Sequence, residues 1–324
     1  MPEKIPVAVV GLGRIASLLD DDMLREKPCT HAGAASANPD CRLLAGADKS
    51  GERRRLFGER WKVPVYEDAG DMLDKHPCKV FCVATHPDSH LFYCRLAAEK
   101  GIPVVICEKP LADSLSSARK IAALPPKTRV ITNHERRYAA DYNEARSILA
   151  KRTLGEPLSI KASLYMGGNR RLVDVLWHDG THLVDAIMFI CDVFLRHGKR
   201  FGPSLSSKSG TAFLYGTTGG GADIPFCIEL GAGRDHLVFE IEVSCAAGRL
   251  RIGNGVFEVC VSAPSTYAEG FRSLSKIRSG FEGPTAYFAG MFADAVSCVK
   301  DATRVPVSGA KQALAVIEYL SSVR

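Results

Sequence analysis

The first part of the chain alternates short apolar runs with segments of helical periodicity. Residues 5–10 (IPVAVV) form a continuous run of apolar residues rich in valine and isoleucine, and similar runs occur at 43–48, 79–84, 104–107 and 129–132. Such runs are typical of buried parallel strands, and the stretches between them are long enough for crossover helices. The pattern therefore predicts a doubly wound parallel sheet of the α/β class. Crossover helices are expected at 51–61, 89–100 and 114–124.

The pattern changes after about residue 136. Several segments of strand character follow one another, and glycine-rich turns such as Gly219-Gly220-Gly221 separate some of them. Strands in succession with hairpin turns predict an antiparallel sheet, so this half is of the α+β type. We therefore expect two domains, 1–136 and 137–324. The expected strands are 158–166, 211–215, 224–230, 236–245, 249–252 and 256–261, and the expected helices are 141–151, 174–191, one around 288–296 and 312–323.

A glycine turn follows the first apolar run. Gly11 and Gly13 stand in the pattern G-x-G-x-x-A, with Arg14 and Ile15 before Ala16. Between a strand and a helix, such a turn lets the backbone approach a pyrophosphate at the positive end of the helix dipole. The expected helix is interrupted by acidic residues at 20–22 and by Lys27-Pro28, and it resumes near residue 31.

Asp48 ends the second expected strand. A carboxylate there can accept both hydroxyls of an adenosine ribose and repels a 2′-phosphate, which favours NAD over NADP. Lys49 and Arg53 follow closely and could serve such a phosphate, so NADP stays an alternative.

Composition narrows the class of protein. The 324 residues are 46% hydrophobic and 24% charged, with a net charge of +6 that is spread along the chain. No basic run is interleaved with aromatic residues, so nucleic acid is not expected as a partner. No apolar run approaches membrane-spanning length and no signal peptide is visible. Eleven irregularly spaced cysteines without a C-x-x-C motif indicate reduced thiols, and we expect a cytoplasmic enzyme.

Several segments resemble blocks of one enzyme family. Residues 101–112 (GIPVVICEKPLA) contain Glu108-Lys109-Pro110, residues 87–90 read P-x-x-H, residues 133–137 end in paired arginines, and residues 180–185 read G-x-H-x-x-D. Together they resemble the Gfo/Idh/MocA oxidoreductases, the family of glucose–fructose oxidoreductase and inositol dehydrogenase. The resemblance implies a Rossmann domain followed by an open-faced, mostly antiparallel sheet, with a cis-proline at Pro110.

The resemblance also implies the reaction and its residues. Lys109 would hydrogen-bond the reacting hydroxyl, and His182 would take its proton while a hydride passes to the nicotinamide. The substrate would be a sugar-like polyol or its keto form. Besides the glycine turn with Asp48 and Lys49, the expected cofactor-binding residues are Thr85, His86, Pro87, His90, Glu108, Lys109 and Arg137.

One position departs from the family pattern D-x-G-x-H. His178 stands where the family usually has aspartate, and Asp179 follows it. With His182 and Asp185 it would share one face of the helix expected at 174–191, so we include His178 among the catalytic candidates. The departure leaves open a NAD-binding regulatory or scaffold protein. The spacing of His178 and His182 leaves open a metal-dependent enzyme, although we expect no metal.

Arginines suggest the charge of the substrate. Arg136, Arg170 and Arg171 come from segments expected to border the substrate cleft, together with Asp179. Arginine forks suit carboxylate or phosphate groups, so the substrate could be anionic, while surface ion pairing is the alternative. An open sheet face also exposes apolar surface, which predicts a homodimer or homotetramer through the second domain.

Overall fold

The computed structural model describes residues 3–221 and 223–323. Its contacts divide the chain into two compact units, Met1–Ala139 with Pro284–Ile317, and Ala140–Gly283 with Glu318–Arg324. The sequence pattern had assigned everything after residue 136 to one domain. Residues 284–317 instead return to the first unit, because the apolar side of α9 (Tyr287–Lys300) packs into the core of the parallel sheet.

The first unit is built on six parallel strands in the order β3-β2-β1-β4-β5-β6. The order reverses between β1 and β4, and this reversal is the point where open α/β sheets bind their ligands. The strands are β1 (Ile5–Val10), β2 (Cys41–Ala47), β3 (Val65–Tyr66), β4 (Val80–Val83), β5 (Val104–Cys107) and β6 (Arg129–Thr132).

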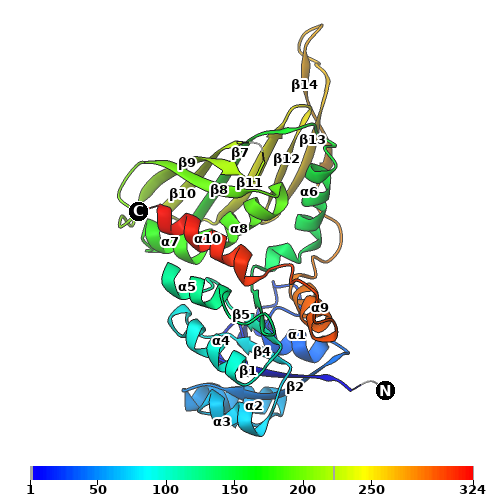
Figure 1. Ribbon diagram of the computed structural model, residues 1–324. Helices are drawn as coiled ribbons and strands as arrows, with labels where there is room; N and C mark the ends of the chain where they lie inside the picture. The colour runs from blue at the N-terminus through cyan, green and yellow to red at the C-terminus, as the bar shows by residue number, and fades with distance from the viewer. Residues whose placement is uncertain (1–2, 222, 324) are drawn as a thin grey trace. The chain divides into compact units, whose positions relative to one another are not determined.

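Helices lie on both faces of this sheet, as the sequence predicted. On one face α1 and α9 pack against alternate residues of the central strands, such as Val7, Val80 and Ile106. On the other face lie α4 and α5, and Figure 1 shows the two pairs on opposite sides of the strands. The helices of the sheet crossovers are α1 (His31–Ala37), α2 (Gly51–Trp61), α3 (Ala69–Lys75), α4 (His90–Glu99) and α5 (Leu115–Ala122).

The segment after the glycine turn differs from an uninterrupted dinucleotide-binding helix. Only turns and a short 3-10 helix, η1 (Leu18–Asp21), follow Gly13, and α1 begins at His31. Yet the N–H of His31 donates to the carbonyl of Ile15 at 3.1 Å, and the N–H of Ala32 donates to Ala16 at 2.9 Å. Residues 17–30 therefore form an inserted loop, here called the excursion, that leaves the chain after Ala16. At His31 the chain returns, and α1 continues the hydrogen bonding to residues 15 and 16.

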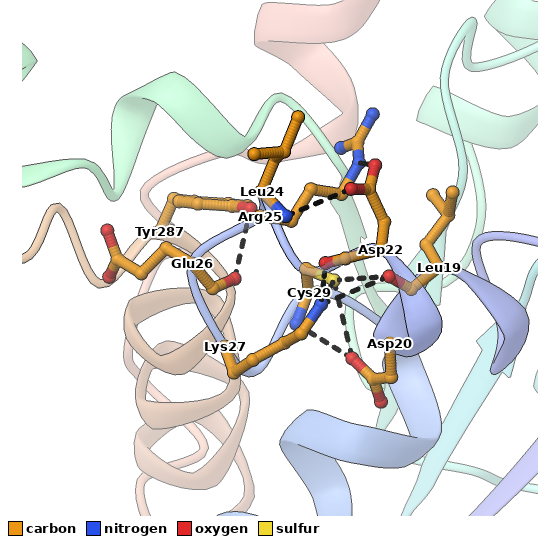
Figure 2. A network of polar contacts seen from close by, with 9 residues as sticks. All are labelled: Leu19, Asp20, Asp22, Leu24, Arg25, Glu26, Lys27, Cys29 and Tyr287. Carbon is orange, nitrogen blue, oxygen red and sulfur yellow. Dashed lines mark hydrogen bonds and ion pairs between the residues drawn. The ribbon is translucent and has the colours of Figure 1, made fainter.

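Internal hydrogen bonds hold the excursion together (Figure 2). The ammonium of Lys27 donates to the carbonyls of Leu19 (3.2 Å) and Asp22 (2.5 Å). The Asp20 carboxylate accepts from the Cys29 N–H at 3.2 Å. A segment that satisfies its own polar groups in this way can leave the helix without leaving buried groups unpaired.

The second unit contains eight strands in the order β14-β13-β12-β11-β7-β10-β9-β8. Only β7 and β10 pair in parallel, so the sheet is mostly antiparallel, as predicted. Figure 1 shows the β13–β14 hairpin extending beyond the other strands of this sheet. The strands are β7 (Pro157–Gly167), β8 (Phe194–Phe201), β9 (Gly210–Gly219), β10 (Pro225–Arg234), β11 (Val238–Cys245), β12 (Gly248–Gly253), β13 (Val256–Pro264) and β14 (Arg272–Ser279).

Helices of the second unit pack against this sheet. They are α6 (Ala140–Ala150), α7 (Leu172–His178) and α8 (Gly180–Cys191), while α10 (Ala310–Ser322) crosses from the first unit into the second. The prediction of a single helix at 174–191 is wrong, because Asp179 interrupts the helix and separates α7 from α8. No helix in the described ranges combines the length and the apolar character that a bilayer crossing requires.

Several outward-facing residues of the central strands are charged. Arg251 of β12 pairs with Glu240 at 2.7 Å and with Glu258 at 3.0 Å, on the strands to either side. Large exposed apolar side chains occur on the two edge strands, for example Phe201 on β8 and Ile277 on β14, and also on inner strands, as Leu158 on β7 and Tyr215 on β9. The exposed surface of the sheet therefore combines cross-strand ion pairs with apolar side chains.

Candidate active site

The glycine turn is built for close backbone approach. Gly11 has φ +82°, and a Cβ on it would lie 2.7 Å from the backbone of Ala84, so only glycine fits between β1 and β4. A Cβ on Gly13 would meet only the guanidinium of Arg53, at 3.7 Å. The open side of Gly13 thus has room for a pyrophosphate, while Ala16 is buried, Ile15 is half-buried and Arg14 is exposed. These residues fit a dinucleotide.

The carboxylate of Asp48 lies beside this turn. It accepts hydrogen bonds from the N–H of Leu12 at 2.7 Å and of Ser50 at 2.8 Å, which orient it at the end of β2. Arg53 of α2 lies 3.6 Å from the same carboxylate, whereas Lys49 is exposed and 3.8 Å from Asp68. A ribose-binding acid and a neighbouring arginine therefore meet at one place, and Lys49 faces a different acid.

The P-x-x-H segment has a structural role for its histidine. His90 is fully buried, with Nδ1 3.0 Å from the carbonyl of Pro110 and Nε2 3.1 Å from the carbonyl of Thr85. Burial lowers the pKa of His90. The imidazole ties the loop after β4 to the turn after β5, so its ring nitrogens are used within the protein. Thr85 and Pro87 are half-buried and His86 is exposed.

The turn after β5 carries Lys109, half-buried, with a cis peptide bond to Pro110 as the resemblance implied. Glu108 before it is buried, and its Oε1 lies 2.8 Å from Nε2 of His31 and 2.6 Å from Nδ2 of Asn133. Burial alone would raise the pKa of Glu108, but His31 and Asn133 hold it below its usual value. Glu108 is thus an ionised internal acceptor.

The paired arginines lie in the short helix η3 (Glu135–Arg137) after β6. Arg136 is 3.3 Å from the carboxylate of Glu135. Arg137 is buried and close to the carbonyl of Val307, at 3.5 Å. Both side chains have partners within the first unit.

The second unit holds the histidine candidates. His182 and Asp185 lie on α8 and are buried, whereas His178 ends α7 and is largely exposed. Asp179 between them accepts from Nδ1 of His178 at 3.0 Å and from Arg170 at 3.1 Å. The prediction that His178 and His182 share one helix face is therefore wrong, because the helix is interrupted at Asp179 and the two histidines lie on different helices.

Two further observations concern charge and metal in this unit. Arg171 pairs with Asp174 at 2.7 Å at the start of α7, in a capping arrangement. Within residues 3–221 and 223–323, no group of three or more His, Cys, Asp or Glu side chains could hold a metal ion. The arginines expected at the substrate are thus engaged with acids of their own unit.

His31 and Asn133 are site residues that sequence reasoning did not assign a role. His31 is separated from Glu108 by 77 positions, and a single histidine at a helix start has no recognisable spacing to its partner. Asn133 precedes the paired arginines, but nothing in the sequence indicates that its amide reaches back to β5. Only the parallel order of β5 and β6 brings the two together.

A glycine turn after β1, an acid after β2 and a lysine after β5, all at the carboxyl edge of one parallel sheet, define a dinucleotide-binding oxidoreductase. Residues 5–134 match the model of the oxidoreductase family with an NAD-binding Rossmann fold. Residues 5–134 are thus similar to the NAD-binding domain of the Gfo/Idh/MocA oxidoreductases.

Individual relatives agree with this assignment. The chain is 27% identical over 283 residues to inositol 2-dehydrogenase of Streptomyces avermitilis, covering 83% of this chain and 78% of the relative. An NADPH-dependent oxidoreductase structure from Desulfitobacterium hafniense superimposes with a TM-score of 0.80 at 16% identity, covering 100% and 95% of the two chains. An oxidoreductase from Agrobacterium radiobacter in complex with NAD+, L-tartaric acid and magnesium gives 0.72 at 16% identity, covering 99% and 95%. The two structural likenesses concern the fold.

Proposed function

We propose that the chain is a cytoplasmic dehydrogenase or reductase that exchanges a hydride between NAD(H) and a secondary alcohol of a sugar-like polyol or its keto form. The observation that carries the proposal is the placement of Lys109 at the carboxyl end of β5, beside an ionised, internally held Glu108. The relationship to an inositol 2-dehydrogenase supports the class of substrate. The orientation of Asp48 toward the glycine turn supports NAD as the preferred cofactor.

The residues divide the chemistry of alcohol oxidation. A bound nicotinamide supplies the hydride acceptor. Lys109 donates a hydrogen bond to the reacting oxygen and stabilises the negative charge that develops on it. His182 accepts the hydroxyl proton, so that loss of hydride from carbon and of proton from oxygen leaves a ketone. In the reverse direction His182 returns the proton to the oxygen.

The ion pairs favour a neutral polyol over an anionic one. Arg136, Arg170 and Arg171 each have a carboxylate within 3.3 Å in their own unit, so none brings an uncompensated positive charge to a substrate. Turnover of inositols and neutral sugars should therefore exceed turnover of the matching sugar acids. Faster oxidation of the acids would show that these arginines exchange their partners for substrate.

The decisive experiment measures NADH absorbance across a panel of inositols, sugars and sugar acids. Lys109→Met and His182→Ala should each reduce hydride transfer by several orders of magnitude, while the NADH affinity measured by fluorescence stays close to that of wild type. Lys120→Met, at an exposed lysine of α5, is the matched control and should retain full turnover. Unchanged turnover in both site variants would refute the assignment.

The departure at His178 supports one second candidate, a NAD-binding regulatory protein. Asp179, the acid nearest the usual position, is engaged by both His178 and Arg170. Wild-type protein that binds NADH tightly yet turns over no member of the panel in either direction would establish this candidate in place of the enzyme.

A further inference from the structure

A buried polar cluster lies beneath the turn that carries Lys109. His31 from the start of α1, Glu108 from the end of β5 and Asn133 from the end of β6 are each at most 7% exposed. One carboxylate oxygen of Glu108 is hydrogen-bonded to both Nε2 of His31 and Nδ2 of Asn133. The other oxygen accepts the N–H of Lys109 itself, at 3.3 Å. Three distant segments thus meet on the residue that precedes the lysine.

The hydrogen bonds indicate the state of the imidazole. Glu108 is ionised, since its pKa lies below the usual value despite burial, with His31 the largest stabilising influence. Nε2 of His31 must then carry the proton that it donates to the carboxylate. Nδ1 of His31 has no hydrogen-bond partner among the residues described.

The imidazole is held in place from several sides. Its ring packs edge-on against Phe288 of α9, with centroids 5.6 Å apart, and lies 6.5 Å from Phe292. The backbone N–H of His31 donates to the carbonyl of Ile15. The hydroxyl of Thr30 caps α1 by accepting from the N–H of Gly33, and it donates to the carboxylate of Asp20 at 2.7 Å. The ring is thus packed against α9 and bonded to Glu108, while its backbone is fixed at the start of α1.

The looped-out excursion contributes to the same anchoring. The carboxylate of Glu26 accepts from the N–H groups of Thr285 and Ala286, at 2.7 and 2.6 Å, just before α9. The carbonyl of Glu26 also receives the hydroxyl of Tyr287, at 3.4 Å (Figure 2). The excursion thereby joins the start of α1 to the start of α9, the two helices that enclose the imidazole.

We propose that His31 is a positioning residue for hydride transfer: by donating to Glu108 it fixes the turn from which Lys109 acts. The inference rests on the proposed role of Lys109 and adds the residue that orients it. Without His31 the buried carboxylate would lose one of the two side-chain donors to its Oε1, and a shift of the carboxylate toward new donors would move the N–H of Lys109 that its other oxygen accepts.

The test compares two replacements of similar size. His31→Gln keeps an N–H donor within reach of Glu108, whereas His31→Leu keeps the volume and removes the donor. We expect His31→Leu to lower kcat by roughly 10- to 100-fold, the effect of misplacing a catalytic group by a fraction of an ångström to one ångström. KM for the polyol and the affinity for NADH should change little, and His31→Gln should recover most of kcat.

Val296→Ala is the control for stability, because it removes buried apolar volume from α9 about one turn beyond Phe292. It should lower the melting temperature and leave kcat unchanged. If His31→Leu and His31→Gln lower kcat equally, or if kcat follows the melting temperature across all three variants, His31 has only a structural role and the inference is overturned.

Lys109→Met measured in parallel separates this inference from the proposed function. If that variant retains turnover, or if no substrate reacts, the proposed function fails and the turn is examined directly in the cofactor-free protein. Labelling of lysine amines followed by mass spectrometry should then show a several-fold change at Lys109 in His31→Leu, relative to exposed Lys120, and none in His31→Gln. Equal labelling of Lys109 in wild type and His31→Leu would overturn the positioning role.

Discussion

Arg53 gives the ribose end of the cofactor site a mixed character. Its guanidinium lies 3.6 Å from Asp48 and faces the open side of Gly13, while half of its side chain is exposed. Asp48 alone would repel a 2′-phosphate, but an arginine fork beside it attracts one. We therefore expect the protein to bind NADP measurably as well as NAD.

Replacing Arg53 with alanine should change this selectivity. We expect the affinity for NADP to fall about 10- to 100-fold, because a charge-assisted bond to phosphate is lost, while the affinity for NAD stays within a few-fold. Titration of both reduced cofactors by fluorescence measures the ratio. Arg55→Ala is the control, since Arg55 pairs with Glu59 on the same helix. Equal weakening of both cofactors in Arg53→Ala would contradict a role in phosphate recognition.

Glu108 should make stability depend on pH. Its pKa is lowered in the folded protein, so its ionisation stabilises the fold at neutral pH and this contribution is lost as pH falls through the ordinary value of about 4.3 and below. Glu108→Gln should therefore be less stable than wild type at pH 7, and the gap should narrow toward pH ~4. Urea unfolding at several pH values measures the gap. A gap that is constant or widens toward acid would contradict an ionised Glu108.

At the scale of elements, the β1 turn depends on a left-handed glycine pressed against β4. Gly11→Ala combines an unfavourable φ with a backbone contact of 2.7 Å, and we expect a loss of about 3 kcal/mol or more in the free energy of unfolding. Gly101 also has positive φ (+68°), but a Cβ there meets nothing within 4 Å. Gly101→Ala should cost only about 1 kcal/mol. Denaturant unfolding compares the two, and equal losses would show that the contact with β4 relaxes.

At the scale of the whole molecule, we expect a homodimer or homotetramer formed through the edge strands of the second unit. Ile277 on β14 is 61% exposed, and Leu274 on the same strand is 47% exposed. Isolated apolar residues on an edge strand are sites where a second copy gains burial. Ile277→Lys should shift sedimentation toward the smaller species, whereas Val305→Lys, at an exposed position of the first unit, should not. A wild-type monomer at all concentrations would contradict the expectation.

Some strands escaped prediction because their residues have no apolar period. β14 reads RSLSKIRS and is almost entirely polar or exposed, and β8 mixes phenylalanine with basic residues. Both are edge strands, which bury little, so their pairing is decided by the neighbouring strand rather than by their own pattern. The helix expected at 174–191 failed for a related reason. Its apolar period continues across Asp179, and periodicity does not register that the helix is interrupted there.

The order of apolar runs and turns was enough to predict the parallel sheet, the glycine turn and Asp48, and the resemblance of residues 101–112 to a family block added Lys109. These features are local: each depends on a few consecutive residues whose spacing determines their conformation. Only the tertiary structure decided which polar and charged groups from distant parts of the sequence pair with one another. The packing of separate elements places Arg53 beside Asp48 and brings His31 and Asn133 to Glu108. It also places Asp179 against Arg170, one of the arginines expected at the substrate. Burial then makes those pairings energetically decisive, because an unpaired charge that water would tolerate on the surface is costly in the core.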